Sequence, residues 1–495
     1  TIEITKKQND IPILIGVNQD NEITKYENKE LKKVGGYFLR ENKGLKELNL
    51  PKLEIAGDYF LLSNEEIQKL NLPELKETGD RFLNSNKELK KLNLPKLEIT
   101  GDNFLYWNEG IQELNLPKLK KVGNRFLYNN RKLKELNLPK LEITGDNFIR
   151  WNQEIQELNL PELKEVEDNC LTNNTELKKI NMPKLELVES DFLSSNTKIQ
   201  ELNLPELKEI RKNFLFSNIE LKELNMPNLE KTGDNFLAVN RRIQKLNLPE
   251  LKEVGGDFLG ANNVLKELNL SNLKIVGNSF LGYNEEIQEL NLPELKEAGS
   301  YFLKSNKGLK ELNLPKLQKV KDFFLDENEK IQKLNLPELK EVGASFLTQN
   351  RELKELNLPK LKEVGYIFLY HNKVAKQLNM PKLEKVGENF LYNNEDLQEL
   401  NLPELKEVGN QFLANNKKLK EVNMPNLRNN ENLNVRLSNL VLKNKNSLSS
   451  DDKIDSTEIA KVDNDNKITE EEEKNAGIII ENLIEKEQIN DNERD

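Results

Sequence analysis

The chain has 495 residues, of which 36% are apolar and 32% are charged, and its formal net charge is −10. It holds one cysteine, Cys170, and one histidine, His371, which excludes an internal disulfide framework and a zinc site built from cysteine and histidine. No apolar run approaches the ~20 residues that a transmembrane helix needs, so we expect no membrane-spanning segment.

The negative charge belongs mostly to the C-terminal segment. Residues 427–495 hold 17 acidic and 10 basic side chains, a net charge of −7. The preceding 426 residues hold 67 acidic and 64 basic side chains, a net charge of −3. Neither part has the basic surplus of a nucleic-acid-binding surface, so we expect no nucleic-acid partner.

The first segment, residues 1–30, lies outside the pattern that fills most of the chain. It contains an apolar-alternating run from Ile11 to Val17, which is typical of a strand. We expect this segment to form an N-terminal cap, because the open end of a repeat array exposes apolar side chains and unpaired backbone groups.

Residues 31–426 consist of eighteen units of 22 residues without insertion. The unit at 119–140 reads LKKVGNRFLYNNRKLKELNLPK, and the consensus is L-x-x-V-G-x-x-F-L-x-x-N-x-x-L-x-x-L-N-L-P-x. Phe holds the eighth position in seventeen units, with Cys170 as the exception, and Pro holds the twenty-first in seventeen, with Ser271 as the exception. A second period of 44 residues alternates Ile-Gln units with Leu-Lys units.

Each unit predicts one turn of a solenoid. In L-N-L-P two leucines alternate with a polar residue, the period of a half-buried strand that the proline ends. The Phe-Leu-x-x-Asn stretch suits a helical or 3₁₀ turn, and the glycine at the fifth position suits a tight corner. Units 7–9 lose that glycine to Glu167, Glu189 and Arg211, beside the Phe-to-Cys exchange at 170, and we hypothesise a local kink over residues 163–228.

Asparagine occupies two positions of every unit. The one at the twelfth position follows Phe by four residues, so we expect a buried structural ladder whose amides bond to the turn backbone of their own and the next unit. Its first six members are Asn42, Asn64, Asn86, Asn108, Asn130 and Asn152. The one at the nineteenth position should face outward from the sheet, either as a solvated ladder or as a weak multivalent contact with a repetitive ligand.

The tenth and eleventh positions vary most, and both tryptophans of the chain fall there. Three successive units carry Tyr106, Trp107, Tyr128, Arg150 and Trp151, which stacking would bring into one column. Aromatic side chains beside an arginine are typical of a protein-binding hot spot, although they would also suit a shielded solenoid corner. Tyr370, His371 and Tyr392 form a weaker second cluster, in which we interpret His371 as a solvated loop residue. We interpret Cys170 as a small buried hydrophobe.

The chain ends in a different composition. Residues 427–442 are expected to cap the last unit, and residues 443–495 to form an acidic, largely flexible tail with a helix over 470–489. The sequence KVDNDNKITEEE at 461–472 resembles an EF-hand loop, but Lys461 replaces the first acidic ligand and Asn466 the glycine. We therefore favour a loop that leads into a helix and expect no metal site.

The 22-residue unit resembles the leucine-rich repeat, and most of all the BspA-like bacterial subfamily. That subfamily reads roughly I-x-I-P-x-x-V-x-x-I-G-x-x-A-F-x-x-C-x-x-L, and the matching stretch here is LNLPKLKKVGNRFLYNNRKL. This unit is one residue shorter between Pro and Val, and Asn replaces Cys. The resemblance implies a leucine-rich repeat solenoid with a parallel β-sheet on the concave face, short strands, and helical or 3₁₀ turns on the other faces.

The resemblance also implies a function in binding. Such proteins are similar to secreted or surface adhesins and other scaffolds, so we expect a non-enzymatic module of a bacterial surface or secreted protein that binds a protein or glycan, without a cofactor. A passive spacer or stalk is the first alternative, and the uniform repeat faces favour it. An intracellular, cytoplasmic scaffold or effector is the second alternative.

Overall fold

A computed structural model describes residues 2–8, 11–17, 19, 22–218, 220–372, 377–428, 433 and 437. The chain divides into two units, Thr1–Asn434 and Val435–Asp495, of which the first contains the repeats. Most of the expected C-terminal cap at 427–442 lies outside the described residues. The whole tail at 443–495, with its predicted helix over 470–489 and its EF-hand-like loop, also lies outside them.

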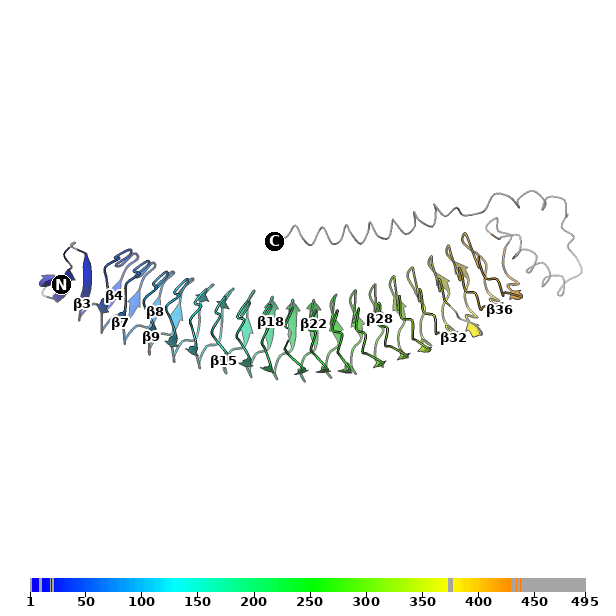
Figure 1. Ribbon diagram of the computed structural model, residues 1–495, viewed down its shortest axis with the longest axis horizontal. Coiled ribbons are helices and arrows are strands. Elements are labelled where there is room, and N and C mark those ends of the chain that lie inside the picture. Colours follow the sequence, from blue (N-terminus) through cyan, green and yellow to red (C-terminus); the bar gives the residue numbers. More distant parts are fainter. Residues whose placement is uncertain are drawn as a thin grey trace, which may run out of the picture. The chain divides into compact units, whose positions relative to one another are not determined.

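Each 22-residue repeat forms one turn of a parallel β-solenoid, and the turns stack side by side (Figure 1). The sequence E/K-L-N forms one three-residue strand in every turn, because its central leucine points into the core and its asparagine points out. The eighteen strands are β5 (Glu47–Asn49), β7 (Lys69–Asn71), β9 (Lys91–Asn93), β11 (Glu113–Asn115), β13 (Glu135–Asn137), β15 (Glu157–Asn159), β17 (Lys179–Asn181), β19 (Glu201–Asn203), β21 (Glu223–Asn225), β23 (Lys245–Asn247), β25 (Glu267–Asn269), β27 (Glu289–Asn291), β29 (Glu311–Asn313), β31 (Lys333–Asn335), β32 (Glu355–Asn357), β34 (Gln377–Asn379), β36 (Glu399–Asn401) and β37 (Glu421–Asn423).

These strands pair in parallel within six groups of two to four neighbours, with a register of one repeat, so that identical positions face each other. Leu114 of β11, for example, pairs with Leu92 on one side and Leu136 on the other. We call this ladder the first sheet. The expected parallel sheet of short strands is therefore confirmed.

A second sheet runs along the turns at the third and fourth positions of the repeat, where Val or Ile points inward. Most of its strands have two residues, and three of them have four. They are β4 (Lys33–Val34), β6 (Ile55–Ala56), β8 (Glu77–Thr78), β10 (Ile99–Thr100), β16 (Glu165–Val166), β18 (Leu187–Ser190), β20 (Glu209–Lys212), β22 (Lys231–Asp234), β24 (Glu253–Val254), β26 (Ile275–Val276), β28 (Glu297–Ala298), β30 (Lys319–Val320), β33 (Glu363–Val364) and β35 (Lys385–Val386). From β16 to β30 the sheet is continuous.

The N-terminal segment extends the first sheet beyond the repeats. Strands β1 (Ile2–Gln8), β2 (Ile11–Val17) and β3 (Ile23–Asn28) form an antiparallel meander. Strand β3 then pairs in parallel with β5, through Tyr26 opposite Leu48. The segment therefore occupies the end of the first sheet, where we expected an N-terminal cap.

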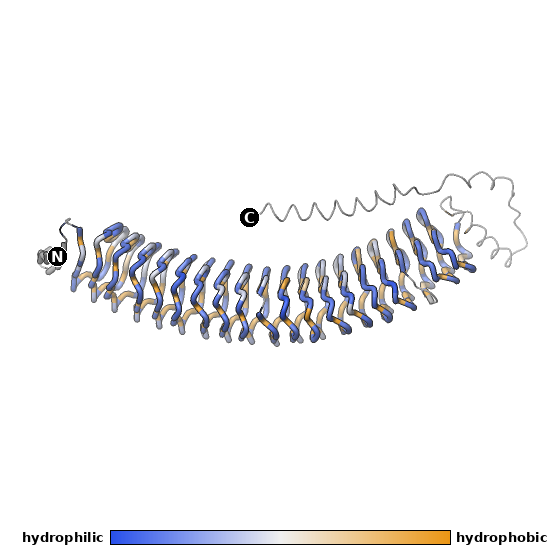
Figure 2. Tube along the Cα trace, viewed as in Figure 1, coloured by the Kyte–Doolittle hydropathy of each residue, from blue (hydrophilic) through white to orange (hydrophobic). Residues whose placement is uncertain are grey.

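The core is a column of identical side chains. Leucines at the first, ninth, fifteenth and twentieth positions and phenylalanine at the eighth are buried in nearly every turn. The phenyl rings stack in parallel between neighbouring turns, from 5.0 Å between Phe60 and Phe82 to 5.8 Å between Phe192 and Phe214. Figure 2 shows apolar segments recurring in register along the stack. No single turn encloses these residues, so the turns must stack to bury them.

The expected helical or 3₁₀ turn at Phe-Leu-x-x-Asn is wrong, since no described residue between 22 and 428 is helical. Residues at the seventh and eleventh positions, and in most turns the ninth, adopt left-handed backbone angles, as in Tyr59 (φ 57°), Leu61 (φ 54°) and Ser63 (φ 56°). Alternate N–H groups therefore point to opposite neighbours. Tyr59 and Ser63 donate to the following turn, at 2.7 and 2.9 Å, and Leu61 donates to the preceding turn at 3.1 Å.

This geometry explains why the chain forms the left-handed turn here instead of a helical turn. A helical turn would satisfy its N–H groups internally, whereas this turn uses them to join its neighbours. The left-handed angles cost about 1–2 kcal/mol for a residue with a side chain, so the bonds between turns must offset that cost.

The fifth-position glycine serves close approach rather than a special turn, because no described glycine has a positive φ. A Cβ on Gly277 would lie 2.5 Å from the carbonyl carbon of Gly255 in the preceding turn. A Cβ on Gly35, in the first repeat, would meet nothing within 4 Å. The glycine is therefore needed where one turn packs on another.

The hypothesis of a kink over residues 163–228 is also wrong. The second sheet runs through this region without a break in register, and the ribbon follows one smooth curve there (Figure 1). Where Glu189 and Arg211 replace glycine, strands β18 and β20 lengthen to four residues. The replacing side chains form an ion pair, with Arg211 Nη1 3.0 Å from Glu189 Oε2. At these two positions the backbone is thus extended, where the sequence had suggested a tight corner at glycine.

Candidate functional site

The five side chains predicted as a binding column lie on three adjacent turns. We call Tyr106, Trp107, Tyr128, Arg150 and Trp151 the aromatic strip. The rings of Tyr106 and Tyr128 stack with centroids 5.0 Å apart, and the ring of Trp107 lies 6.0 Å from that of Tyr106. Trp107 is 48% exposed and Trp151 is 38% exposed, whereas the two tyrosines and Arg150 are half-buried.

The backbone under the aromatic strip differs from that of the other turns. At the ninth position Leu105, Leu127 and Ile149 are absent from the residues with positive φ, whereas this leucine is left-handed in the other fifteen turns. The Leu105 N–H donates forward, to the Phe126 carbonyl oxygen at 3.0 Å, and the Leu127 N–H donates forward to Phe148. Elsewhere this N–H donates backward, as Leu83 does to Phe60.

This local change creates an additional ladder. Strands β12 (Leu127–Tyr128) and β14 (Ile149–Arg150) form only here in the described chain, and they pair Tyr128 with Arg150. Extended backbone alternates its side chains between two faces, so Leu127 and Ile149 point into the core while Tyr128 and Arg150 point out. The ladder thus fixes the spacing of the outward side chains.

Backbone bonds also hold the two tryptophans. The Trp107 N–H donates to the Tyr128 carbonyl oxygen at 3.0 Å, and the Trp151 N–H donates to that of Thr172 at 3.3 Å. Both residues have left-handed backbone angles, φ 60° and 62°. Between them in the stack, Asn129 is only 5% exposed. The two indoles therefore flank a recessed residue, two turns apart.

The guanidinium of Arg150 is only partly hydrogen-bonded within the chain. Its Nη1 donates to Asn147 Oδ1 at 2.9 Å, and Asn147 lies in the same turn. Its Nε is buried and has no hydrogen-bond partner within the chain. That Nε lies below the surface, so a ligand would have to bond the terminal nitrogens of the guanidinium instead.

The predicted asparagine ladder lies inside the solenoid. Asn64, Asn86, Asn108, Asn130 and Asn152 are fully buried, and Asn42 in the first repeat is partly exposed. In Asn130, Nδ2 donates to the Leu105 carbonyl oxygen at 2.7 Å and Oδ1 accepts the Asn108 N–H at 3.2 Å. Nδ2 also lies 3.5 Å from the Tyr128 carbonyl oxygen of its own turn. The amide therefore bonds to its own turn, as expected, and to the preceding turn, whereas we expected the next.

The outward asparagines form a second, exposed ladder along the first sheet. In many turns Nδ2 donates to Oδ1 of the asparagine before, as in Asn115 to Asn93 at 2.8 Å and Asn137 to Asn115 at 2.7 Å. Asn115 is thus bonded to asparagines on both sides. This face is uniform from turn to turn.

The second aromatic cluster lies at the same turn position near the end of the array. Tyr370 and Tyr392 stack at 5.2 Å, and His371 contacts Tyr370 at 4.1 Å edge-on. His371 is exposed, and its Nδ1 is 2.9 Å from Asn393 Nδ2. One hydrogen-bond partner of His371 is thus the Asn393 amide.

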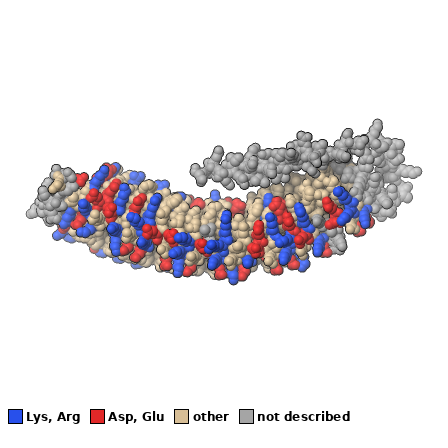
Figure 3. Space-filling model, viewed as in Figure 1, with Lys and Arg blue, Asp and Glu red and all other residues tan. Residues whose placement is uncertain are grey.

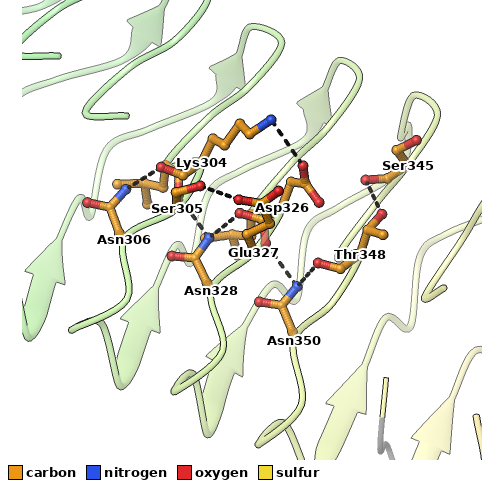
Figure 4. Close-up of polar contacts among 11 residues, drawn as sticks. Lys304, Ser305, Asn306, Asp326, Glu327, Asn328, Ser345, Thr348 and Asn350 are labelled. Atoms are coloured by element: carbon orange, nitrogen blue, oxygen red, sulfur yellow. Dashed lines mark hydrogen bonds and ion pairs between the residues drawn. The ribbon is translucent and has the colours of Figure 1, made fainter. Parts of the chain in front are cut away.

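An acidic pair that the sequence did not single out contains a strongly perturbed carboxyl group (Figure 4). Burial raises the pKa of Asp326 to about 6, although the ammonium group of Lys304, 3.5 Å away, opposes that rise. The adjacent Glu327 accepts a 2.6 Å hydrogen bond from Ser305 Oγ. The sequence pattern that could have indicated this site is the presence of two acidic residues, Asp326 and Glu327, at the tenth and eleventh positions of one unit.

The described residues offer no catalytic or metal-binding set. No group of three or more His, Cys, Asp or Glu side chains among them could hold a metal ion. Burial raises the pKa of the Cys170 thiol to about 12, which makes it a poor nucleophile. Among these same residues, none lies in a helix with the length and apolar character required to cross a membrane.

Comparison with known families agrees with this geometry. The profile of the BspA type leucine-rich repeat region, in six copies, matches residues 19–134, 98–215, 211–324 and 318–436. The chain belongs to this family. Its repeats form the non-catalytic solenoid scaffold that leucine-rich repeat proteins use to bind protein partners.

Solved structures with a similar fold include three bacterial proteins. A leucine-rich repeat protein from Bacteroides ovatus is 14% identical, with 83% of this chain and 92% of that chain covered and a TM-score of 0.34. A leucine-rich cell surface protein from Faecalibacterium prausnitzii is 12% identical, with coverages of 88% and 97% and a TM-score of 0.29. The pneumococcal vaccine antigen PcpA is 13% identical, with coverages of 81% and 93% and a TM-score of 0.30. No curated protein matches the sequence.

Proposed function

We propose that this protein is a non-enzymatic, adhesin-like binding module of a bacterial surface or secreted protein, and that the aromatic strip is its contact site for a protein partner. The observation that carries the proposal is the exposure of Trp107 and Trp151, the only two tryptophans of the chain, two turns apart on the same column. Tryptophan, tyrosine and arginine are the residues that dominate binding hot spots.

The rigidity of the site supports this function. Stacking of Tyr106 on Tyr128 and backbone bonding of both tryptophans limit the motion that a partner would have to arrest. Ordering a mobile side chain on binding costs about 0.5–1.5 kcal/mol, so a strip that is already ordered retains more of its contact energy. The partly satisfied Arg150 adds a polar anchor beside the rings.

A passive spacer or stalk is the second candidate. The exposed asparagine ladder supports it, because a face that repeats in every turn is not shaped for one partner. The same face also fits weak, multivalent contact with a repetitive glycan. The spacer and the binding module differ in one consequence, since only the module loses binding when the aromatic strip is changed.

Location is part of the proposal. A surface or secreted location is supported by the family, whose bacterial members include surface proteins. A cytoplasmic scaffold is the alternative. Fractionation of the source cells, with protease treatment of intact cells, separates the two, because only a surface protein is digested from outside.

The test is a binding measurement with matched variants. The full chain is passed over immobilised host extracellular-matrix proteins, and Trp107→Ala/Trp151→Ala is compared with Tyr283→Ala. Tyr283 is a suitable control because it holds the same eleventh position and is 54% exposed. We expect the double variant to lose about tenfold or more in affinity and the control to bind as the parent does. Equal binding by all three refutes the site, and no saturable binding by the parent favours the spacer.

A further inference from the structure

The second position of the repeat carries an alternating charge in the first part of the array. Lysine and glutamate exchange from turn to turn without exception through eleven units. These residues are Lys32, Glu54, Lys76, Glu98, Lys120, Glu142, Lys164, Glu186, Lys208, Glu230 and Lys252. The alternation follows the 44-residue period of the sequence.

Because the charges alternate at this position, a lysine can form an ion pair with the glutamate at the same position of the turn before it. Lys76 Nζ lies 2.8 Å from Glu54 Oε2, and the same pair recurs as Lys120 with Glu98 at 3.0 Å and Lys208 with Glu186 at 2.8 Å. Lys252 pairs with Glu230 at 2.7 Å. The opposite charges are thus compensated locally along this edge, and Figure 3 shows basic and acidic side chains as alternating stripes over the visible face.

The alternation fails over the next five turns. The second position there holds Lys274, Lys296, Gln318, Lys340 and Lys362, so three turns have lost the glutamate that the period predicts. We call the four lysines of this segment the lysine row. All four are exposed, and within the described part of the chain none has a carboxylate oxygen at ion-pair distance. Lys340 Nζ has only the Gln318 amide oxygen, at 3.4 Å.

A surface hollow lies at the C-terminal end of the lysine row. Its volume is about 770 Å³, and it is lined by Val342, four lysines and two glutamates, which are Lys340, Lys360, Lys362, Lys382, Glu341 and Glu363. Between β30 and β33 the second sheet continues through isolated bridges at Glu341, as it also does at Lys121 and Ile143 between β10 and β16.

The turns are also farther apart beside the hollow. A Cβ on Gly365 would lie 3.4 Å from the backbone of the preceding turn, whereas the same atom on Gly387 would lie at 2.7 Å. A second hollow of about 450 Å³ shares Val342 with the first and has Tyr366, 56% exposed, in its wall. The two hollows therefore combine ammonium groups, an apolar floor and an exposed aromatic ring.

Charge spacing narrows the class of ligand. Neighbouring turns are ~4.8 Å apart, so the lysine row places its charges one or two turns, about 5–10 Å, apart. Duplex DNA carries one charge per ~1.7 Å, which is much denser, and Glu297, Glu341 and Glu363 beside the row would repel so dense a polyanion. A carbohydrate chain with one anionic group on every sugar or every second sugar has the sparser spacing. An aromatic ring such as Tyr366 also stacks on a sugar face.

We propose that the lysine row and its hollow bind a linear acidic polysaccharide. The lysines pair with successive carboxylate or sulfate groups along the chain, and the hollow takes one sugar against Val342 and Tyr366. This site is separate from the aromatic strip and does not depend on it. It requires only the uncompensated charge of turns 12–16.

The experiment uses the full chain and heparin as the polysaccharide probe, with calorimetric titration at several salt concentrations. Lys340→Gln/Lys362→Gln is compared with Lys76→Gln/Lys120→Gln, which removes the same charge from lysines that are already paired. A third variant, Lys274→Glu/Gln318→Glu/Lys362→Glu, restores the alternation that eleven other turns tolerate, so it is expected to fold. Circular dichroism and thermal unfolding confirm the fold of each variant.

We expect the parent to bind heparin with an affinity that falls as salt rises. The first and third variants should lose about tenfold or more, and the paired-lysine control should change by less than about twofold. Equal affinity of all variants overturns the proposal. Single-stranded DNA or polyglutamate binding as tightly as heparin overturns the polysaccharide assignment, and so does the absence of binding by the parent.

Discussion

Replacement of one buried asparagine tests what joins the turns. Asn262 in the eleventh repeat is fully buried, and its Nδ2 donates to the carbonyl oxygens of Leu237 at 3.0 Å and Gly260 at 3.2 Å. Its Oδ1 accepts the Asn240 N–H at 2.9 Å. Asn262→Ala leaves the Asn240 N–H and the Leu237 carbonyl buried without a partner, and each such group costs about 1–3 kcal/mol.

The expected loss for the two groups is therefore about 2–6 kcal/mol of local stability. At about 1.4 kcal/mol per factor of ten, this makes opening of turns 10–12 at least about 30-fold more frequent. Amide hydrogen exchange followed by mass spectrometry measures that opening for each turn, which suits a repeat array better than a single melting temperature.

The same repeat offers the control. Asn269 is exposed, and its Nδ2 donates to Asn247 Oδ1 at 2.7 Å. Water replaces that bond in Asn269→Ala, so the loss should stay below about 1 kcal/mol. If both variants raise exchange in these turns equally, the buried amides do not join the turns and the reasoning is refuted.

Three further predictions concern single positions. Gly277→Ala should destabilise the protein by about 1–3 kcal/mol in urea unfolding, because the new Cβ would lie 2.5 Å from the preceding turn. Gly35→Ala, whose Cβ meets no atom within 4 Å, should be nearly neutral. Equal effects of the two substitutions would contradict the close-approach role of the glycine. Asp326, whose pKa rises from 3.8 unfolded to about 6 folded, binds its proton more tightly in the folded state, so stability should fall as pH rises from about 4 to 6. Asp326→Asn should flatten that fall, and an unchanged profile would exclude Asp326 as its cause. The Cys170 thiol should react with a thiol reagent only after unfolding, and rapid labelling of the folded protein would contradict its burial.

The repeated features of the fold follow from the sequence because the same local pattern decides them in each unit. Leucines on both sides of an outward asparagine specify a half-buried strand, as in Leu114 and Leu116 around Asn115. The inward direction of Asn130 follows in the same way from its distance to Phe126. Eighteen repetitions make these patterns unambiguous.

The turn conformation did not follow from the sequence because neighbouring turns decide it. Nothing in the residue type of Leu61 favours a left-handed angle, and only its bond to the turn before it stabilises that angle. The glycine at 277 shows the same limit, since its role depends on the distance to Gly255. Both features depend on contacts 22 residues apart that no single unit contains.

Some features of the candidate site could also be predicted from the sequence, and others could not. The column of Tyr106, Trp107 and Trp151 could be predicted because the repeat period aligns positions that vary. The forward-donating backbone beneath it and the recess at Asn129 could not, since three successive turns form them together. The hollow beside Lys340 was missed because side chains of two neighbouring turns line it together, and no single unit contains it.

The most direct test of the binding account uses the tryptophans themselves. The chain has only two, so intrinsic tryptophan fluorescence reports the aromatic strip and nothing else. During titration with a matrix protein that binds the full chain, we expect a saturable change in emission whose midpoint equals the binding constant measured independently, because Trp107 and Trp151 lose water on contact. Saturable binding with unchanged tryptophan emission would contradict the account.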